Sequence, residues 1–326
     1  MPRLTRRHAL VTGLAAVAAP SIVRAQAWPA QTTTVVVPFP PGGSTDAIAR
    51  MAQPGLQAEL GTNVIIENKP GASGSLGTGQ VAKAKPDGAT WLVVFDTHGV
   101  NPALYPNLNF NTLEDLEPVT LVGTAPHVIA IHPSAAHKTW ADAVTASKAK
   151  AGGLNYGSIG TGSLGHLTML RMMKAGGFPM THIPYRGGGP LNTDMVGGKL
   201  DLGIASTGLF GPQLAGKTIL PLLQTGKTRL PTLPDTPTAI EAGFPGMESV
   251  AWWGVFAPKG TPADLITRFR SAFIKTLQGE TNAKTMREGQ QITTIYSEPA
   301  ALKTFVAEQI ALWTPVIREN DIKPGN

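Results

Sequence analysis

Two glycine-rich loops with hydroxyl side chains are the parts of this sequence best suited to bind a small molecule. They cover residues 38–46 (PFPPGGSTD) and 157–166 (GSIGTGSLGH), and each precedes a segment with helical spacing. A helix start presents unpaired N–H groups and the positive end of the helix dipole. Glycines let the backbone approach a ligand closely, and Ser and Thr hydroxyls donate hydrogen bonds to its oxygens. The pattern favours a carboxylate or phosphate site that needs no Lys or Arg.

The same residues allow two other interpretations. Each loop could be an ordinary helix N-cap with a tight turn that binds nothing. Ser163 and His166 could belong to a Ser–His–acid triad, which would make the protein a hydrolase, but nothing in the sequence marks the acid. The nucleophile-elbow pattern G-x-S-x-G fails at Ser163, because Thr161 stands two residues before it.

The composition excludes several classes of protein. The chain has 326 residues, of which 42% are hydrophobic and 15% charged, so it is long enough for more than one domain and too apolar to be disordered. The absence of cysteine excludes disulfides, thiol nucleophiles and cysteine-ligated metals. His127, His132 and His137 do not have the i, i+4 spacing of a metal-binding helix. We predict no metal and no cofactor.

The first 27 residues have the organisation of an export signal. A basic start with Arg6 and Arg7 is followed by an apolar stretch over 9–19 and a small-residue cleavage site at 25–27 (AQA). The paired arginines resemble a twin-arginine signal, with general secretion as the alternative. We predict cleavage near Ala27 and a periplasmic mature protein. Without this segment the net charge falls from +6 to +2, which is too small a positive charge to indicate a nucleic-acid partner.

Strand-like and helix-like segments alternate along the mature chain, which indicates parallel βαβ units. In the first half we predict strands over 32–39, 63–68 and 90–95 and helices over 45–60 and 75–84. Pro54 is expected to kink or shorten the first helix. Beyond residue 126 we predict strands over 127–133, 180–185, 200–206, 218–224 and 251–258, with the strand-like LNYGSIG (154–160) among them, and helices over 139–150, 163–174, 262–277 and 299–318.

At these motifs the chain resembles the Bug receptors, also called the TctC family. These are the extracytoplasmic solute-binding proteins of tripartite tricarboxylate transporters. The matching stretches include VVVPFPPGGSTDAIAR, LNYGSIGTGSLGHLTM and HIPYRGGGPLNTDMVGGKLDLGIAS. The resemblance covers nearly all of residues 30–326, with its blocks in the family's order and at its spacing.

The resemblance implies a two-domain periplasmic-binding-protein fold of the Venus-flytrap type, in which each domain is a mostly parallel sheet flanked by helices. Residues 28–124 and 253–326 would form the first domain and residues 125–252 the second. It also implies a ligand drawn from di- and tricarboxylates, acidic amino acids or aromatic acids, and membrane transporter subunits as partners. A receptor of this kind is expected to be a monomer without enzymatic activity. A sensor kinase is the alternative partner.

The resemblance also implies the binding residues. They are Phe39, Gly42, Gly43, Ser44, Thr45 and Asp46 of the first loop, Ala72 and Ser73, Gly160, Thr161, Gly162 and Ser163 of the second loop with His166 nearby, Tyr185, and Ser206 and Thr207. Asp46 is expected to hold its loop through hydrogen bonds rather than to touch the anion. Tyr185 is expected near the cleft and Arg186 in a structural role.

Asp96 and Thr97 follow the third strand, where the family more often has small or hydroxyl residues. If Asp96 faces the cleft, it would repel a plain dianion and favour a ligand that carries an amine or another donor. The alternative is that Asp96 caps the following turn. Both residues are counted among the candidate ligand-binding residues.

Overall fold

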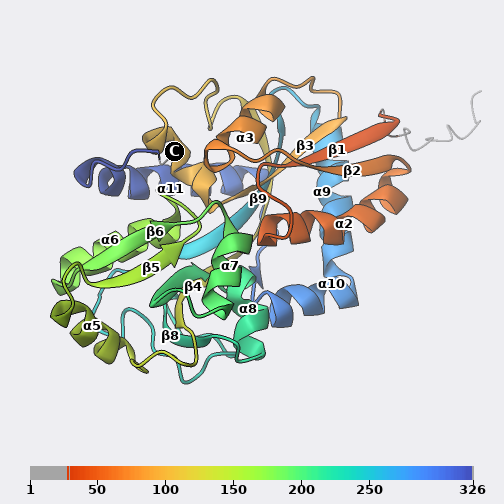
Figure 1. The fold of residues 1–326 in the computed structure, drawn as a ribbon. Helices are drawn as coiled ribbons and strands as arrows, with labels where there is room; N and C mark the ends of the chain where they lie inside the picture. Colours follow the sequence, from red (N-terminus) through yellow and green to blue (C-terminus); the bar gives the residue numbers. More distant parts are fainter. Residues whose placement is uncertain (1–27, 29, 325–326) are drawn as a thin grey trace, which may run out of the picture.

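Two mixed sheets, each built around three parallel strands rich in β-branched and aliphatic residues, form the framework of the protein. The computed structural model describes Trp28 and residues 30–324 (Figure 1). The predicted signal peptide and its cleavage site lie outside these described residues. No helix in the described part of the chain is long and apolar enough to cross a membrane.

We call the part built on the first sheet the first lobe. Its strands β1 (Thr32–Val37), β2 (Asn63–Asn68) and β3 (Thr90–Phe95) pair in parallel, with β1 in the middle. The helices α2 (Ser44–Leu60) and α3 (Ser75–Ala82) connect them. Strand β3 also pairs antiparallel with β9 (Val250–Pro258).

We call the part built on the second sheet the second lobe. Its strands β5 (Leu154–Ser158), β6 (Met180–Pro184) and β7 (Leu202–Ser206) are again parallel. Strand β8 (Leu220–Gln224) pairs antiparallel with β4. The helices of this lobe are α5 (Trp140–Ala149), α6 (Leu164–Gly176), α7 (Gly188–Val196) and α8 (Thr207–Ala215).

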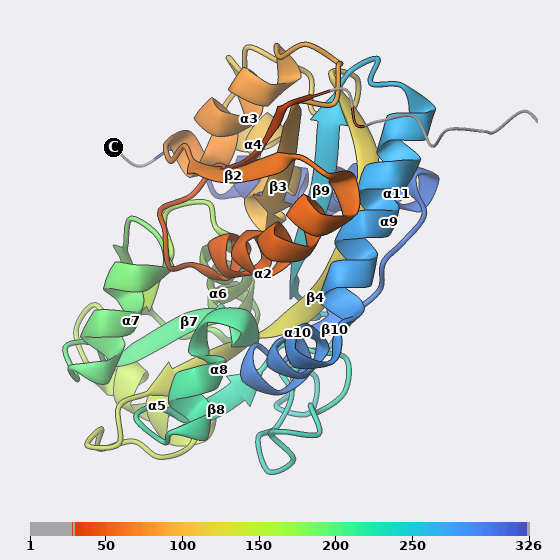
Figure 2. The same ribbon diagram turned by 90° about the vertical axis from the view of Figure 1, so that its right-hand side faces the viewer.

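Strand β4 (Leu116–Ile131) runs through both lobes (Figure 2). Its residues 116–126 pair antiparallel with β9, and its residues 127–130 pair antiparallel with β7. The partner of β4 therefore changes between Pro126 and His127. The chain crosses between the lobes on β4 and returns on β9, and the exact domain boundaries predicted near 124 and 252 stay a prediction.

The C-terminal helices pack mainly on the first lobe. They are α9 (Ala263–Gln278), α10 (Glu280–Lys284) and α11 (Pro299–Glu319), with β10 (Thr293–Thr294) pairing with β4. Helix α9 lies beside α2 (Figure 2). A small apolar cluster joins the lobes, because Leu104 of α4 (Asn101–Leu104) packs with Leu164 of α6 and Trp313 of α11.

The predicted α/β fold is confirmed, although several elements differ from the prediction. Helices α4, α7, α8 and α10 and the two-residue strand β10 were not among the predicted elements. Helix α2 is not shortened at Pro54 but runs to Leu60 and ends on Gly61, whose φ of 66° is the left-handed conformation that favours glycine. Strand β4 starts eleven residues before the predicted strand, at Leu116 instead of 127. Pairing with β9, which is distant in sequence, extends it.

Candidate functional site

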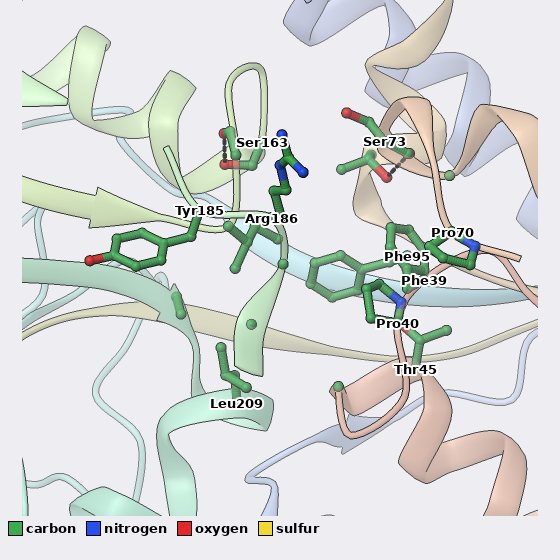
Figure 3. Close-up of a pocket in the computed structure, with 18 of the residues that line it drawn as sticks. Phe39, Pro40, Thr45, Pro70, Ser73, Phe95, Ser163, Tyr185, Arg186 and Leu209 are labelled. Atoms are coloured by element: carbon green, nitrogen blue, oxygen red, sulfur yellow. Dashed lines mark hydrogen bonds between the residues drawn. The ribbon is translucent and has the colours of Figure 1, made fainter. Parts of the chain in front are cut away.

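A cavity of about 620 Å³ lies between the lobes, with residues of both in its walls (Figure 3). The first lobe contributes the loop after β1, the loop after β2 and the end of β3. The second lobe contributes the loops after β5, β6 and β7. These are the carboxyl ends of parallel strands, where α/β sheets commonly bind ligands.

The loop after β1 is held by Asp46. Its Oδ2 accepts hydrogen bonds from the Gly42 N–H at 3.0 Å and from Arg50 Nε at 2.9 Å. Its Oδ1 accepts one from Asn68 Nδ2 at 2.9 Å, and Asn68 also donates to the Phe39 carbonyl at 3.0 Å. Asp46 is buried and does not line the cavity. It holds the loop, as expected from the sequence.

The loop after β2 turns sharply at the rim of the cavity. Ala72 and Ser73 both have positive φ, 47° and 52°, which is strained for residues other than glycine. The Ser73 carbonyl accepts hydrogen bonds from Thr97 Oγ1 at 2.9 Å and Asn101 Nδ2 at 3.0 Å. Its hydroxyl shares a hydrogen bond of 3.1 Å with the Tyr105 hydroxyl. Side chains that follow β3 thus fix this loop.

The loop after β5 is held by neutral groups. Ser163 is the N-cap of α6: its Oγ accepts from the His166 N–H at 3.4 Å and donates to the Gly160 carbonyl at 2.7 Å. Beneath it, Ser158 Oγ lies 3.2 Å from Ser163 Oγ and 2.7 Å from His182 Nε2.

The imidazoles of His166 and His182 stack under this loop, with ring centroids 3.9 Å apart. His166 Nδ1 accepts a hydrogen bond from the Gly162 N–H at 3.0 Å, so this nitrogen carries no proton. Burial, and to a smaller extent the neighbouring His182, lower the pKa of His166 to about 3. Burial also lowers the pKa of His182 to about 4. Both rings are therefore neutral at pH 7.

Several helices begin at the cavity. The N-cap residues of α2, α3, α6, α7 and α8 all line it; they are Gly43, Gly74, Ser163, Gly187 and Ser206. Gly43, Gly74 and Gly187 have no side chain with which to cap their helices, and the Ser206 hydroxyl makes no cap hydrogen bond within the described chain. Positive dipole ends and N–H groups without intrahelical partners thus face one space, which favours an anion.

Arg186 and Phe39 extend into the cavity from opposite walls (Figure 3). Among the described residues that line the cavity, Arg186 is the sole Lys or Arg, and no Asp or Glu lines it. The expectation of a structural role for Arg186 is thus not supported. Tyr185 also lines the cavity, but its hydroxyl points away and donates to Asp194 Oδ2 at 2.8 Å. The cavity wall therefore carries a positive charge.

Asp96 does not line the cavity. Its side chain is completely buried, so the cavity-facing position that would favour a donor-bearing ligand is not the one observed. Neither carboxylate oxygen has a hydrogen bond of ordinary geometry within the described chain, but the Thr97 N–H is close enough to lower the pKa of the carboxyl, so the turn-capping alternative stays a prediction. Instead, Oδ2 lies 3.7 Å from Nε2 of His127, which does line the cavity.

The structure brings most of the predicted residues together around the cavity. Those that line it are Phe39, Gly43, Ser44, Thr45, Ala72, Ser73, Thr97, Gly160, Thr161, Ser163, Tyr185 and Ser206. Those that do not line it are Gly42, Asp46, Asp96, Gly162, His166 and Thr207. Of this second group, Gly42, Asp46, Gly162 and His166 support the lining loops through the hydrogen bonds described above.

Sequence reasoning missed several lining residues. Arg186, His127 and the glycines at 187–189, which begin α7, were not among the candidates. The run RGGGP carried a signal for the glycines, because it also places a glycine-rich loop before a helix. Nothing local to the sequence shows that the side chains of Arg186 and His127 face the cavity.

Two α/β lobes joined by two strands, with an anion-favouring cavity between them, define the class of solute-binding proteins. The family described as "Tripartite tricarboxylate transporter family receptor" matches residues 48–322. The chain belongs to this family of solute-binding receptors.

Relatives and solved structures agree with this assignment. BugT of Bordetella pertussis is 31% identical over 325 residues, which is 99% of each chain. The structure of MatC from Rhodopseudomonas palustris with bound malate is 31% identical, with a TM-score of 0.81 over 89% of this chain and 99% of that one. The structure of Rpa4515 from R. palustris with adipate is 29% identical, with a TM-score of 0.85 over 91% of this chain and all of that one.

Proposed function

We propose that the protein captures a small organic carboxylate in the cavity between its lobes and delivers it to a tripartite tricarboxylate transporter. The observation that carries this proposal is the convergence of helix N-termini and Arg186 on a cavity without an acidic lining residue. The malate and adipate in the structures of MatC and Rpa4515 support the same ligand class.

Binding would proceed by closure of the lobes over the ligand. Both walls of the cavity contribute polar groups, so a ligand held by one wall completes its hydrogen bonds when the other wall approaches. Strands β4 and β9 would bend at the crossing near Pro126 and His127. The residues that line the cavity, Arg186 among them, would contact the ligand.

The arrangement around Ser163 supports a receptor over a hydrolase. The Ser163 hydroxyl donates to the Gly160 carbonyl and accepts from the His166 amide, so it serves as a helix cap. The His166 imidazole accepts from the Gly162 amide instead of from Ser163. A serine nucleophile needs a base within hydrogen-bond reach of its hydroxyl, and His166 is not so placed.

The cellular setting proposed here follows from the family. After removal of a signal peptide near Ala27, the mature protein would be a periplasmic monomer whose partners are the membrane subunits of the transporter. A receptor of the same fold can also serve a sensor kinase, and no feature of this cavity favours that partner over a transporter.

The direct test is a thermal-unfolding screen of the mature protein after refolding to remove copurified ligand. The panel contains mono-, di- and tricarboxylates, acidic amino acids and aromatic acids, with the matching amides as uncharged controls. A ligand at a hundred times its Kd adds about 2.7 kcal/mol to the free energy of unfolding. We expect a rise in Tm of a few degrees for one subset of acids and none for their amides.

Two results would contradict the proposal. One is the absence of any shift with carboxylates. The other is turnover of ester substrates that is lost in Ser163→Ala, which would restore the hydrolase interpretation.

A further inference from the structure

A buried carboxyl and a buried imidazole meet directly behind the cavity. Asp96 Oδ2 lies 3.7 Å from His127 Nε2, with both side chains almost fully buried. Asp96 follows β3 in the first lobe, and His127 is the first residue of β4 that pairs with the second lobe. The contact therefore joins the two lobes at the crossing strand.

The surroundings leave this pair without other charged partners. Neither Asp96 oxygen has a hydrogen bond of ordinary geometry within the described chain, although the Thr97 N–H is close enough to lower the pKa of the carboxyl, and His127 is the only ion-pair partner of Asp96 among the described residues. His98, on the same turn as Asp96, packs its ring against Phe256 and Trp252. On the other side, the His127 backbone is fixed by Thr225, which accepts from its N–H at 2.9 Å and donates to its carbonyl at 2.9 Å.

These surroundings determine where protons reside in the ligand-free protein. An ionised carboxylate that is buried without a partner costs several kcal/mol. Burial accordingly raises the pKa of Asp96 well above its ordinary value and lowers the pKa of His127 to about 4. Both shifts favour the uncharged pair, a protonated carboxyl beside a neutral imidazole, over a buried ion pair, and the carboxyl proton is the one that can be transferred.

We propose that Asp96 and His127 form a second anion-binding point, in which the shared proton moves from the Asp96 carboxyl to the His127 imidazole when a ligand carboxylate lies against His127. The proton leaves one group and joins the other, so the pair stays neutral overall. The proton arrives on Nε2, which lies toward Asp96, so the Asp96 carboxylate is the counter-charge and the positive ring of His127 in the cavity wall attracts the ligand carboxylate. The contact of 3.7 Å shortens to a hydrogen bond in the liganded form, as apo contacts often do.

This proposal rests on the proposed function and names its ligand class. Arg186 and the helix N-termini provide for one acid group, and the Asp96–His127 pair provides for another. The preferred ligand is a dicarboxylate without a cationic group. Asp96 is thus a positioning residue that acts through His127, and His127 is the specificity-determining residue in the cavity wall.

Calorimetry on matched ligands tests the proposal. The probes are succinate, glutarate and adipate, each compared with butanoate, pentanoate or hexanoate of equal length. In Asp96→Asn and in His127→Gln, we expect dicarboxylate affinity to fall about ten- to a hundred-fold, the size of a charged hydrogen bond. Monocarboxylate affinity should stay within about two-fold. His98→Gln is the matched control, because His98 is equally buried but does not line the cavity.

Proton counting separates this role from a merely structural one. Titrations in buffers of different ionisation enthalpy should show almost no net proton uptake by the wild type, because the proton moves within the protein. Dicarboxylate that still binds Asp96→Asn should draw a proton from solvent, and its affinity should rise as the pH falls. In the unmodified protein, the ¹⁵N shifts of His127 should become those of an imidazolium with the dicarboxylate only.

The outcomes are distinguishable. Equal losses for mono- and dicarboxylates, or unchanged His127 shifts with a bound dicarboxylate, would overturn the inference while leaving the receptor function intact. Failure of the wild type to bind any carboxylate would instead contradict the proposed function. The NMR measurement needs no variant, so misfolding of Asp96→Asn would not prevent a decision.

Discussion

The loops after β1 and β5 occupy equivalent places on opposite walls of the cavity, but different chemistry holds them. Each follows a parallel strand, contains glycines and starts a helix at the cavity. The first is anchored by an ionised group, the Asp46 carboxylate, with Arg50 as its counter-charge. The second is anchored by neutral groups, namely Ser158 and the stacked rings of His166 and His182. Loops with the same task can thus differ in their response to pH.

The pKa values indicate the direction of this difference. Burial alone would raise the pKa of Asp46, but hydrogen bonds from Arg50, Gly42 and Asn68 lower it overall. This carboxylate therefore contributes its full stabilisation above the unfolded pKa of an aspartate, about 3.9, and loses it only as the pH falls below that value. His166 and His182 have folded pKa values of about 3 and 4, against 6.5 unfolded, so the unfolded chain binds more protons as the pH falls below 7. Between pH 7 and pH 4 the second loop loses stability and the first does not.

Filling the cavity from the first wall should have the largest effect. Gly43 lines the cavity, and a Cβ there would meet no atom closer than the Pro40 carbonyl oxygen at 3.9 Å. Gly43→Leu should therefore fold and place its side chain where the ligand binds, reducing affinity by about a hundred-fold or more. Calorimetry with the tightest ligand of the screen measures the loss.

Gly43→Ala is the matched control, because it loses the same N-cap preference, worth about 1 kcal/mol, with much less bulk. Both variants should melt within a few degrees of the wild type. Unchanged affinity in Gly43→Leu would remove the first wall from the binding site.

Removing the charge from the second wall should have the next largest effect. Arg186→Gln keeps a polar side chain but not the cation, and we expect affinity for carboxylates to fall about ten-fold or more. Stability should not change, since the Arg186 side chain forms no ion pair or hydrogen bond with the described residues. Arg318→Gln, at an exposed position of α11, is the control. If Arg186→Gln bound carboxylates as tightly as the wild type, the second wall would bind the ligand through backbone amides and hydroxyls alone.

The smallest effect is the pH dependence of stability. We expect Tm to fall by a few degrees from pH 7 to pH 5, because the buried histidines must be protonated on unfolding. Asp96 opposes this fall, since its raised pKa favours the folded state as the pH decreases. His182→Gln should make the fall smaller, whereas Asp46→Asn should lower Tm equally at both pH values. The reverse pattern would contradict the difference between the loops.

Local patterns were sufficient to predict the two loops. A buried strand, a run of glycines and hydroxyls and a helix start are neighbours in sequence, so their geometry at 38–46 and 157–166 needs no distant contact. The same holds for Asp46, whose partners Gly42 and Arg50 lie within one helical turn. Residues 116–126 of β4 were missed because Glu117, Pro118 and Gly123 weaken the strand pattern, and β9 supplies the pairing.

Side-chain direction could not be predicted where both faces of a strand are buried. Every residue of β3 from Trp91 to Phe95 is buried, so buried and exposed positions do not alternate along the strand. The position of Asp96 after the strand therefore gave no indication of whether its side chain faces the cavity. Arg186 lies in a loop whose position depends on how β6 packs in the second lobe, and the family's usual Tyr–Lys pair suggested no ligand contact. Tertiary structure decided both positions.

The antiparallel pairing of β4 with β9 has a mechanical consequence. The two segments that connect the lobes are hydrogen-bonded to each other up to the crossing, from Leu116–Pro258 to Pro126–Val250. Such a ribbon resists in-plane shear, because sliding would break its ladder, but it bends readily out of the plane. Register shifts at Pro118–Thr120 and Leu121–Gly123 add local points of compliance. If the lobes close over a ligand as proposed, the ribbon therefore favours a hinge-like bend over sliding.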